Sequence, residues 1–313
     1  MQDLVIENAM IHDGTGKAPT RGSVAVKDGR IAAVSANVGA GKQVIDADGF
    51  ALMPGIIDTH THYDAQITWD PFVNPSPALG VTTVIMGNCG FTIAPCRPSD
   101  RDLVMRNLTH VEGMSLDSLR SGIDWSFESF PEYLDALERR GVGPNTACFV
   151  GHSSIRTFVM REDATKRAAT AEEVEQMRRL VVEGMRAGAC GFSTTRNGQH
   201  NGEAGIPMPS RLADEREMLA LSSALADAGR GVLMMTKDAL PRRSRSSSGW
   251  RGARDGPTWW PRCFTATSPR RPRSTISRRS RLRADAGIVC SVPCRRARLP
   301  SSSRCMSRTY SRA

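Results

Sequence analysis

The chain of 313 residues has a formal net charge of +10, and 40% of its residues are hydrophobic. It contains no apolar stretch of about 18 residues and no basic N-terminal region followed by an apolar one, so we expect neither a transmembrane helix nor a signal peptide. The cysteines are scattered and do not form a disulfide-type spacing, which is typical of a reducing compartment and predicts a cytoplasmic protein.

The charge is divided unevenly along the chain. Residues 241–313 contain 19 arginines, no lysine and two acidic residues, which is a net charge of +17. The first 240 residues therefore carry a net charge of −7. That value is ordinary for a soluble protein and gives no argument for binding nucleic acid or a membrane.

Residues 1–53 alternate short β-rich runs with turns. The turn at Asp28-Gly29 lies between two such runs and predicts a β-hairpin. About 50 residues bury little core by themselves, so we predict half of a small β-sandwich module. The runs are Leu4-Val5-Ile6, Ser23-Val24-Ala25-Val26, Ile31-Ala32-Ala33-Val34 and Gln43-Val44-Ile45.

An apolar run at residues 51–57 predicts a buried strand that ends in a His-x-His motif. Side chains in a strand alternate between its two faces, so His60 and His62 are expected to point the same way and to bind one metal ion. A bare His-x-His is more often a pair of ordinary polar residues. Asp58 and Asp64 favour the metal-ligand interpretation, because carboxylates commonly orient imidazole ligands.

A second predicted strand, residues 80–86, runs directly into Gly87-Asn88-Cys89-Gly90. A thiolate is a strong zinc ligand, so Cys89 is a third candidate ligand. The alternative is a small buried apolar side chain, as free cysteine usually is. The preceding His-x-His motif favours the ligand interpretation.

Helices and strands alternate from there to about residue 240. Capping boxes at Ser129 and Thr170 predict two helix starts, and Asp214 predicts a third. The alternation indicates an α/β protein with a parallel sheet and helices outside it. In a β/α barrel the chemistry lies at the carboxyl ends of the strands. Three residues there, His152, Arg196 and His200, are candidates for substrate binding, with backbone hydrogen bonding in a loop as the alternative for His152.

Residues 241–313 show no helical or strand period. Arg and Ser account for 33 of these 73 residues, so we expect a disordered tail. Out-of-frame reading of GC-rich DNA produces Arg, Ser, Pro, Ala and Gly without Lys, and we predict that the tail is out of frame. The alternative is a genuine Arg-rich arm that binds polyanions through charge alone.

The first 240 residues resemble the amidohydrolase superfamily, and within it the N-acyl-D-amino-acid deacylases (D-aminoacylases). The motif from Pro54 to His62 resembles the superfamily, and Gly87-Asn88-Cys89-Gly90 resembles the deacylase branch. Further similar segments are Val150-Gly151-His152-Ser153, Gly188-Ala189-Cys190-Gly191-Phe192-Ser193-Thr194 and Gly205-Ile206-Pro207-Met208-Pro209-Ser210-Arg211-Leu212-Ala213.

This resemblance implies a metal-dependent TIM-type (β/α)8 barrel that hydrolyses N-acyl-D-amino acids to a D-amino acid and a carboxylate. It implies zinc (Zn2+) as cofactor, with His60, His62 and Cys89 as its ligands. The family also uses histidines after the fifth and sixth strands and an aspartate after the eighth as ligands and general acid/base.

The sequence departs from that family pattern after residue 200, because it contains no later histidine. Thr236-Lys237 stand where the fifth-strand histidine is expected, and residues 54–240 provide about five strands of an eight-stranded barrel. The predicted domains are therefore a β module at 1–53, a partial barrel at 54–240 and the tail at 241–313. We expect the chain as written to be inactive, and its general acid/base residue is not assigned.

The predicted partner is a small N-acyl amino acid, with no specific nucleic acid and no membrane partner. A cyclic-amide hydrolase of the dihydropyrimidinase or hydantoinase kind is an alternative. Those enzymes use a carboxylated lysine after the fourth strand, where this sequence has Ser193 and Thr194. Polyanion binding by the tail is the alternative that involves no enzyme.

Overall fold

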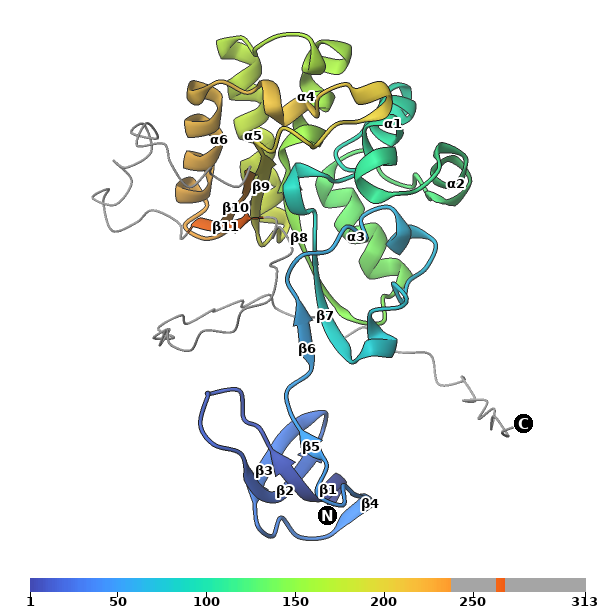
Figure 1. Ribbon diagram of the computed structural model, residues 1–313, viewed down its shortest axis with the longest axis vertical. Helices are drawn as coiled ribbons and strands as arrows, with labels where there is room; N and C mark the ends of the chain where they lie inside the picture. The colour runs from blue at the N-terminus through green and yellow to red at the C-terminus, as the bar shows by residue number, and fades with distance from the viewer. Residues whose placement is uncertain (238–262, 268–313) are drawn as a thin grey trace, which may run out of the picture. The chain divides into compact units, whose positions relative to one another are not determined.

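The computed structural model describes residues 1–237 and 263–267, which form two compact units (Figure 1). The first unit contains Met1–Ile57 together with Gly80–Thr82. The second unit contains Asp58–Leu79 and the chain from Thr83 onward.

The first unit is built on a five-stranded β-sheet. Strand β1 pairs with β2 in antiparallel and with β4 and β5 in parallel orientation, and β2 pairs antiparallel with β3. The β2–β3 hairpin turns at Asp28 and Gly29, both with positive φ, as the Asp-Gly pair predicts. The strands are β1 (Gln2–Ile11), β2 (Thr20–Lys27), β3 (Arg30–Ser35), β4 (Gly41–Asp46) and β5 (Ala51–Leu52).

The predicted strand at residues 51–57 is divided into two. Strand β5 belongs to the small sheet, and β6 (Ile56–Asp58) belongs to the larger one. Pro54 separates them because it has no N–H to donate to a strand pairing. The prediction that this strand is buried is wrong, since Ile56 and Ile57 are 48% and 58% exposed. Among the described residues, strand β6 is the terminal strand of its sheet and has a neighbouring strand on one side only.

The larger sheet has six strands in the order β11-β10-β9-β8-β7-β6, so strands that are consecutive in the chain are neighbours in space (Figure 1). The pairings from β7 to β11 are parallel. This is the order that repeated β-α units produce, and the prediction of an incomplete parallel α/β barrel is confirmed. The remaining strands are β7 (Val81–Met86), β8 (Asn145–Gly151), β9 (Gly191–Thr195), β10 (Val232–Lys237) and β11 (Cys263–Thr267).

Helices connect these strands, and α3, α5 and α6 lie next to one another in sequence order. Predicted capping boxes at Ser129 and Thr170 are present, and the Asp214 side chain accepts a hydrogen bond at the start of α6. Helix α5 buries the predicted apolar face, including Met177 and Val181. Helices α1, α2 and α4 have no counterpart among the predicted elements. The helices are α1 (Arg101–Glu112), α2 (Leu116–Gly122), α3 (Phe130–Arg140), α4 (His152–Met160), α5 (Ala171–Ala187) and α6 (Glu215–Asp227).

Strand β11 corrects the expectation that no strand follows residue 240. It pairs in parallel with β10, from Leu233 opposite Cys263 to Lys237 opposite Thr267. Its five residues include Phe264 and two threonines, which favour strands, and the pairing covers an edge of β10 that would otherwise be open. The rest of the predicted tail, residues 241–262 and 268–313, lies outside the described residues.

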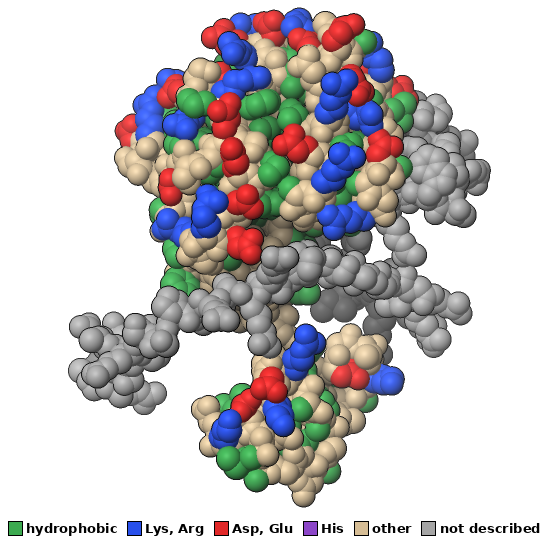
Figure 2. Space-filling view, turned by 180° about the vertical axis from the view of Figure 1, so that it is seen from behind, with side chains coloured by type: hydrophobic (Ala, Val, Ile, Leu, Met, Phe, Trp, Pro, Cys, Tyr) green, Lys and Arg blue, Asp and Glu red, His purple; other side chains and the backbone are tan. Residues whose placement is uncertain are grey.

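The surface of the second unit carries charges of both signs. On the face shown in Figure 2, Lys and Arg side chains are interspersed with Asp and Glu side chains. Within the described part of the chain, no helix has the length and apolarity needed to cross a bilayer. Cysteines 89, 96, 148 and 190 are free thiols.

Candidate metal centre

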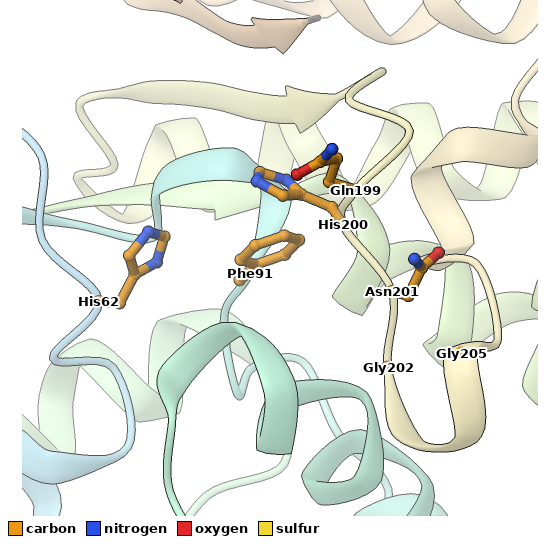
Figure 3. A pocket seen from close by; sticks show the side chains of 7 residues that line it. All are labelled: His62, Phe91, Gln199, His200, Asn201, Gly202 and Gly205. Atoms are coloured by element: carbon orange, nitrogen blue, oxygen red, sulfur yellow. The ribbon is translucent and has the colours of Figure 1, made fainter. Parts of the chain in front are cut away.

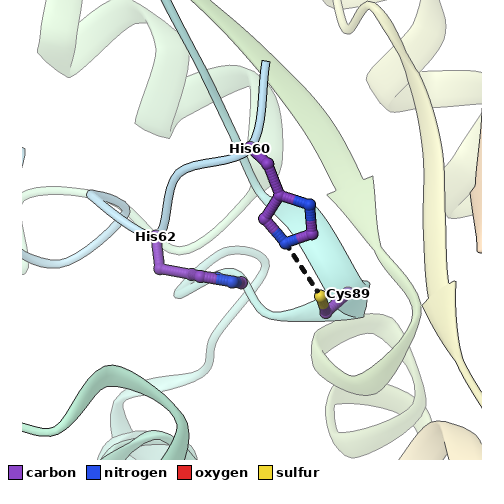
Figure 4. Close-up of side chains that lie close together, drawn as sticks. All are labelled: His60, His62 and Cys89. Carbon is purple, nitrogen blue, oxygen red and sulfur yellow. Dashed lines mark hydrogen bonds between the residues drawn. The ribbon is translucent and has the colours of Figure 1, made fainter. Parts of the chain in front are cut away.

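The three predicted metal ligands lie together in the structure. His60, His62 and Cys89 each offer one ligand atom, and these atoms all lie within 4.8 Å of one another (Figure 4). Cys89 Sγ is 3.3 Å from His60 Nε2, and the two imidazole centroids are 5.3 Å apart. Both histidines follow β6, whereas Cys89 lies in a short helical turn directly after β7.

Hydrogen bonds tie the histidine segment to the cysteine turn. Asn88 Nδ2 donates to Thr61 O at 3.2 Å and to Ile85 O at 2.8 Å. Gly87 N donates to the buried Asp64 Oδ2 at 2.9 Å, although burial still raises the pKa of Asp64 to about 7. Asp64 therefore orients the backbone of the turn and not an imidazole, which differs from its predicted contact.

The other predicted orienting carboxylate also binds backbone. Asp58 Oδ1 accepts a hydrogen bond from the backbone N–H of His60 at 3.2 Å. Because a short side chain two residues earlier in the chain readily forms an Asx turn, this local contact replaces the expected contact with the ring.

Cys89 adopts a left-handed backbone conformation, with φ of 58°. Such a conformation costs a residue with a side chain about 1–2 kcal/mol, so its neighbours must hold it. Ser193 Oγ donates to Gly87 O and accepts from Gly90 N at 3.0 Å. Cys89 N donates to Met234 Sδ at 3.4 Å. Strands β9 and β10 therefore fix the turn that presents the thiol.

Burial sets the protonation states of the three side chains. It lowers the pKa of His60, and it lowers the pKa of His62 to about 4, with smaller contributions from the charges of His60 and His200. Both imidazoles are therefore neutral near pH 7 and available as ligands. Burial raises the pKa of Cys89 to about 11, partly offset by a hydrogen bond with Thr236, so the thiol is protonated near pH 7 and would have to lose that proton to bind a cation.

The ligand geometry fits one metal ion. His62 Nδ1 is buried and has no hydrogen-bond partner among the described residues, and an unpaired buried nitrogen costs about 1–3 kcal/mol. In a tetrahedral zinc site, bond lengths of about 2.1 Å to nitrogen and 2.3 Å to sulfur place these two atoms about 3.6 Å apart. The observed 3.3 Å between Cys89 Sγ and His60 Nε2 is close to that separation.

A cavity of about 430 Å³ adjoins this cluster. Phe91 lies between the rings of His62 and His200, with centroid distances of 5.6 Å and 5.1 Å, and Figure 3 shows both imidazoles bordering the space beside Phe91. Thr195 Oγ1 lies 2.8 Å from His200 Nδ1 and orients that ring. The lining residues are His62, Phe91, Gln199, His200, Asn201, Gly202 and Gly205.

The prediction that His152 binds substrate is not supported by its position. His152 is fully buried at the start of α4 and does not line the cavity. Its Nδ1 lies 2.8 Å from Thr194 Oγ1, and its Nε2 lies 2.8 Å from Glu217 Oε1. Both ring nitrogens therefore bind side chains. The alternative prediction, that His152 binds the backbone of a loop, also differs from the structure. Glu217, the partner of Nε2, lies 65 positions away in the chain.

Arg196 also differs from its predicted role. Its guanidinium donates to Ala213 O, and it is absent from the lining of the cavity. The backbone N–H of Arg196 donates to Thr236 O at 2.7 Å, which joins the end of β9 to the end of β10. Among the three predicted substrate-binding residues, His200 alone lines the cavity.

Three residues of the site have no counterpart among the predictions. Asn88 joins the two loops, Phe91 forms a wall of the cavity, and Thr236 contacts the Cys89 sulfur. Asn88 and Phe91 lie within two residues of Cys89, and this closeness in sequence is the signal that could have indicated their place in the site. Nothing local to Thr236 indicates its contact with a residue 147 positions earlier.

Known proteins resemble this chain over the region that holds the site. The Amidohydrolase family matches residues 43–262. A D-aminoacylase of Alcaligenes xylosoxydans xylosoxydans is 38% identical over 194 residues, which cover 61% of this chain and 37% of that protein.

Two solved structures are similar in fold. One, from work on the binuclear metal centre of D-aminoacylase, has a TM-score of 0.61 and 31% identity, and the match covers 75% of this chain and 45% of that one. The other is N-acyl-D-glutamate deacylase from Bordetella bronchiseptica, complexed with zinc and a phosphonate inhibitor. It has a TM-score of 0.60 and 30% identity, and the match covers 75% of this chain and 44% of that one. This chain thus spans less than half the length of these relatives.

The family match includes more than half of the chain, together with the strands that carry His60, His62 and Cys89. The parallel α/β sheet and its order agree with the similar solved structures. The chain therefore belongs to the Amidohydrolase family.

Proposed function

We propose that this chain is part of a zinc-dependent amidohydrolase that cleaves N-acyl-D-amino acids into a D-amino acid and a carboxylate. The observation that carries the proposal is the cluster of His60, His62 and Cys89 beside a cavity. The substrate class is supported by relatives that are a D-aminoacylase and an N-acyl-D-glutamate deacylase.

The cluster suits zinc because two neutral imidazoles and one thiolate are ligands that this ion prefers. A bound zinc ion would supply a water of lowered pKa and would polarise the amide carbonyl. His60 and His62 require no deprotonation near pH 7, since burial lowers the pKa of each. Cys89 must release its proton when it becomes a ligand.

The residues lining the cavity account for substrate binding. Phe91 offers an apolar surface for an acyl chain or an apolar amino-acid side chain. His200, Gln199 and Asn201 offer polar groups, of which Asn201 Oδ1 is already occupied by the guanidinium of Arg211. The Asn201 amide N–H groups therefore remain as donors for a carboxylate of the substrate.

The chain as written is proposed to bind zinc weakly and to turn over little substrate. The family resemblance implies further histidines and an acidic general acid/base after later strands, and the sequence contains no histidine after His200. Thr236 and Lys237, at the end of β10, stand where the fifth-strand histidine is expected. The general acid/base residue therefore stays unassigned.

The proposal is tested by measuring metal binding and hydrolysis on the same preparations. Zinc binding to the 313-residue chain is measured by competition with a chromophoric chelator, and hydrolysis is measured on N-acetyl-D- and N-acetyl-L-amino acids. We expect one zinc site that is lost in Cys89→Ala and His62→Ala. Any hydrolysis should be D-selective and sensitive to a chelator.

The matched control is Cys96→Ala, because Cys96 is an equally buried free thiol outside the cluster. It should leave zinc binding unchanged. Zinc binding that survives in both Cys89→Ala and His62→Ala would contradict the proposed ligands. Hydrolysis of the L-compounds alone would contradict the substrate class.

The cyclic-amide alternative receives no support from the strand ends. Those enzymes have a lysine after the fourth strand, whereas β9 ends in Thr194 and Thr195, which are both fully buried and cannot be carboxylated. The alternative of polyanion binding depends on residues 241–313, of which the structure describes β11 alone. It predicts steeply salt-dependent binding that disappears when those residues are removed.

A further inference from the structure

The end of strand β10 contacts Cys89 at two points. Thr236 is 5% exposed, and its Oγ1 lies 3.1 Å from Cys89 Sγ. Met234 stands two residues earlier, and its Sδ accepts the backbone N–H of Cys89 at 3.4 Å. Side chains two apart in a strand lie on the same face, so one face of β10 holds both the backbone and the sulfur of Cys89.

The hydrogen bond from Thr236 has a clear direction once the sulfur is deprotonated. A thiolate has no proton to give and is a good acceptor, so the hydroxyl must donate. The Thr236 hydroxyl also lies 3.9 Å from Met234 Sδ, which is a longer contact to a weaker acceptor. The thiolate therefore accepts the hydrogen bond that the Thr236 hydroxyl donates.

We propose that Thr236 is a positioning residue for the Cys89 thiolate, holding Sγ toward His60 and tuning its strength as a metal ligand. The inference rests on the proposed function, because it requires Cys89 to bind the metal. A donated hydrogen bond fixes the direction of the sulfur and draws electron density from it. Loss of such a contact to a metal ligand typically lowers metal affinity by about 10–100-fold.

The neighbouring strand provides a matched control. Thr195 is the register partner of Thr236 across the β9–β10 pairing and is likewise buried. Its hydroxyl contacts His200 Nδ1 at 2.8 Å, the backbone Asn197 N at 3.1 Å and the backbone Thr236 O at 3.4 Å, and it makes no contact with the Cys89 sulfur. Thr195→Val therefore also replaces a buried threonine hydroxyl by a methyl group, at the end of the neighbouring strand β9.

The experiment titrates the full chain and its variants with Co²⁺, whose thiolate complexes absorb through sulfur-to-metal charge transfer. Thr236→Val should bind Co²⁺ about 10–100-fold more weakly than the unaltered chain. Its charge-transfer band should move to longer wavelength, because a sulfur without this hydrogen bond is richer in electrons. Thr236→Ser should restore both values, and Thr195→Val should keep the band where it is.

The possible outcomes separate this inference from the proposed function. If Thr236→Val keeps both affinity and band position, or if Thr195→Val shifts the band equally, the inference about Thr236 is overturned while the metal site stands. If the unaltered chain shows no charge-transfer band with Co²⁺, Cys89 is not a ligand and both fail. Should Thr236→Val not fold, Thr236→Ala removes the hydroxyl without added bulk and is judged by the same two readouts.

Discussion

Glu217 lies at the centre of a buried group of charged side chains, and its replacement by glutamine should strongly destabilise the second unit. Glu217, His152 and Arg156 have fully buried side chains. One carboxylate oxygen accepts from His152 Nε2 at 2.8 Å, and the other accepts from Arg156 Nη1. Burial by itself would raise the pKa of Glu217, but the contacts with His152 and Arg156 lower it overall, so the carboxylate is charged near pH 7.

The size of the effect follows from the partner that remains. Glutamine keeps the shape of the side chain and loses its charge, which leaves the buried Arg156 guanidinium without its hydrogen-bonded counter-ion. Arg156 would retain only neutral carbonyl acceptors, Ala164 O and Arg167 O. Breaking one partner of a buried ion pair costs about 3–5 kcal/mol. For a unit of this size, we expect the melting temperature to fall by roughly 6–20 °C.

The measurement is equilibrium unfolding in urea, followed by circular dichroism, with thermal unfolding as a second probe. The control is Glu175→Gln, which makes the same chemical change in an ion pair on the surface. Glu175 is 43% exposed and accepts from Arg178 and Arg179, so its loss should cost less than about 1 kcal/mol. Equal losses in Glu217→Gln and Glu175→Gln would refute the reasoning from buried charge.

Four further predictions concern packing, acid stability, metal binding and the tail. Gly191→Ala would place a Cβ 2.0 Å from Val232 O, so it should lower the free energy of unfolding by about 3 kcal/mol, at the upper end of the usual range for overpacking, or prevent folding, as urea unfolding would show. The hydrogen bonds from Arg167 lower the pKa of Glu173 to about 2 from 4.5. The stability that Glu173 contributes is therefore complete above about pH 4.5 and is lost as the pH falls toward 2. In Glu173→Gln, the free energy of unfolding should fall by about 1–2 kcal/mol less than in the unaltered chain over that pH range. Because the Cys89 thiol must lose its proton, zinc affinity should rise about tenfold per pH unit between about pH 7 and 9, and a flat profile would contradict this. Finally, if residues 241–313 are out of frame, another frame of the coding DNA after about codon 240 should show alternating strands and helices and an apolar strand ending in histidine, whereas early stops there would make the tail genuine.

Local sequence patterns predicted much of the fold because they act over short distances. Capping boxes at Ser129 and Thr170 are satisfied within one helical turn, and the Asp28-Gly29 hairpin is decided by two backbone conformations. The alternation of strands and helices then leaves few ways to arrange a parallel sheet. The grouping of His60, His62 and Cys89 follows from that order, since the strand ends that carry them are neighbours.

Tertiary structure alone decided which polar side chains face the cavity and which are buried. His152 and His200 both follow strands, yet His152 is enclosed by Glu217 and Thr194, whereas His200 is turned to the cavity by Thr195. Strand β11 and the contact of Thr236 with Cys89 depend likewise on residues far apart in the chain. Hydrogen bonds and burial between distant segments leave no periodic pattern in a single sequence, because each partner is chosen by the packed structure and not by its neighbours in the chain.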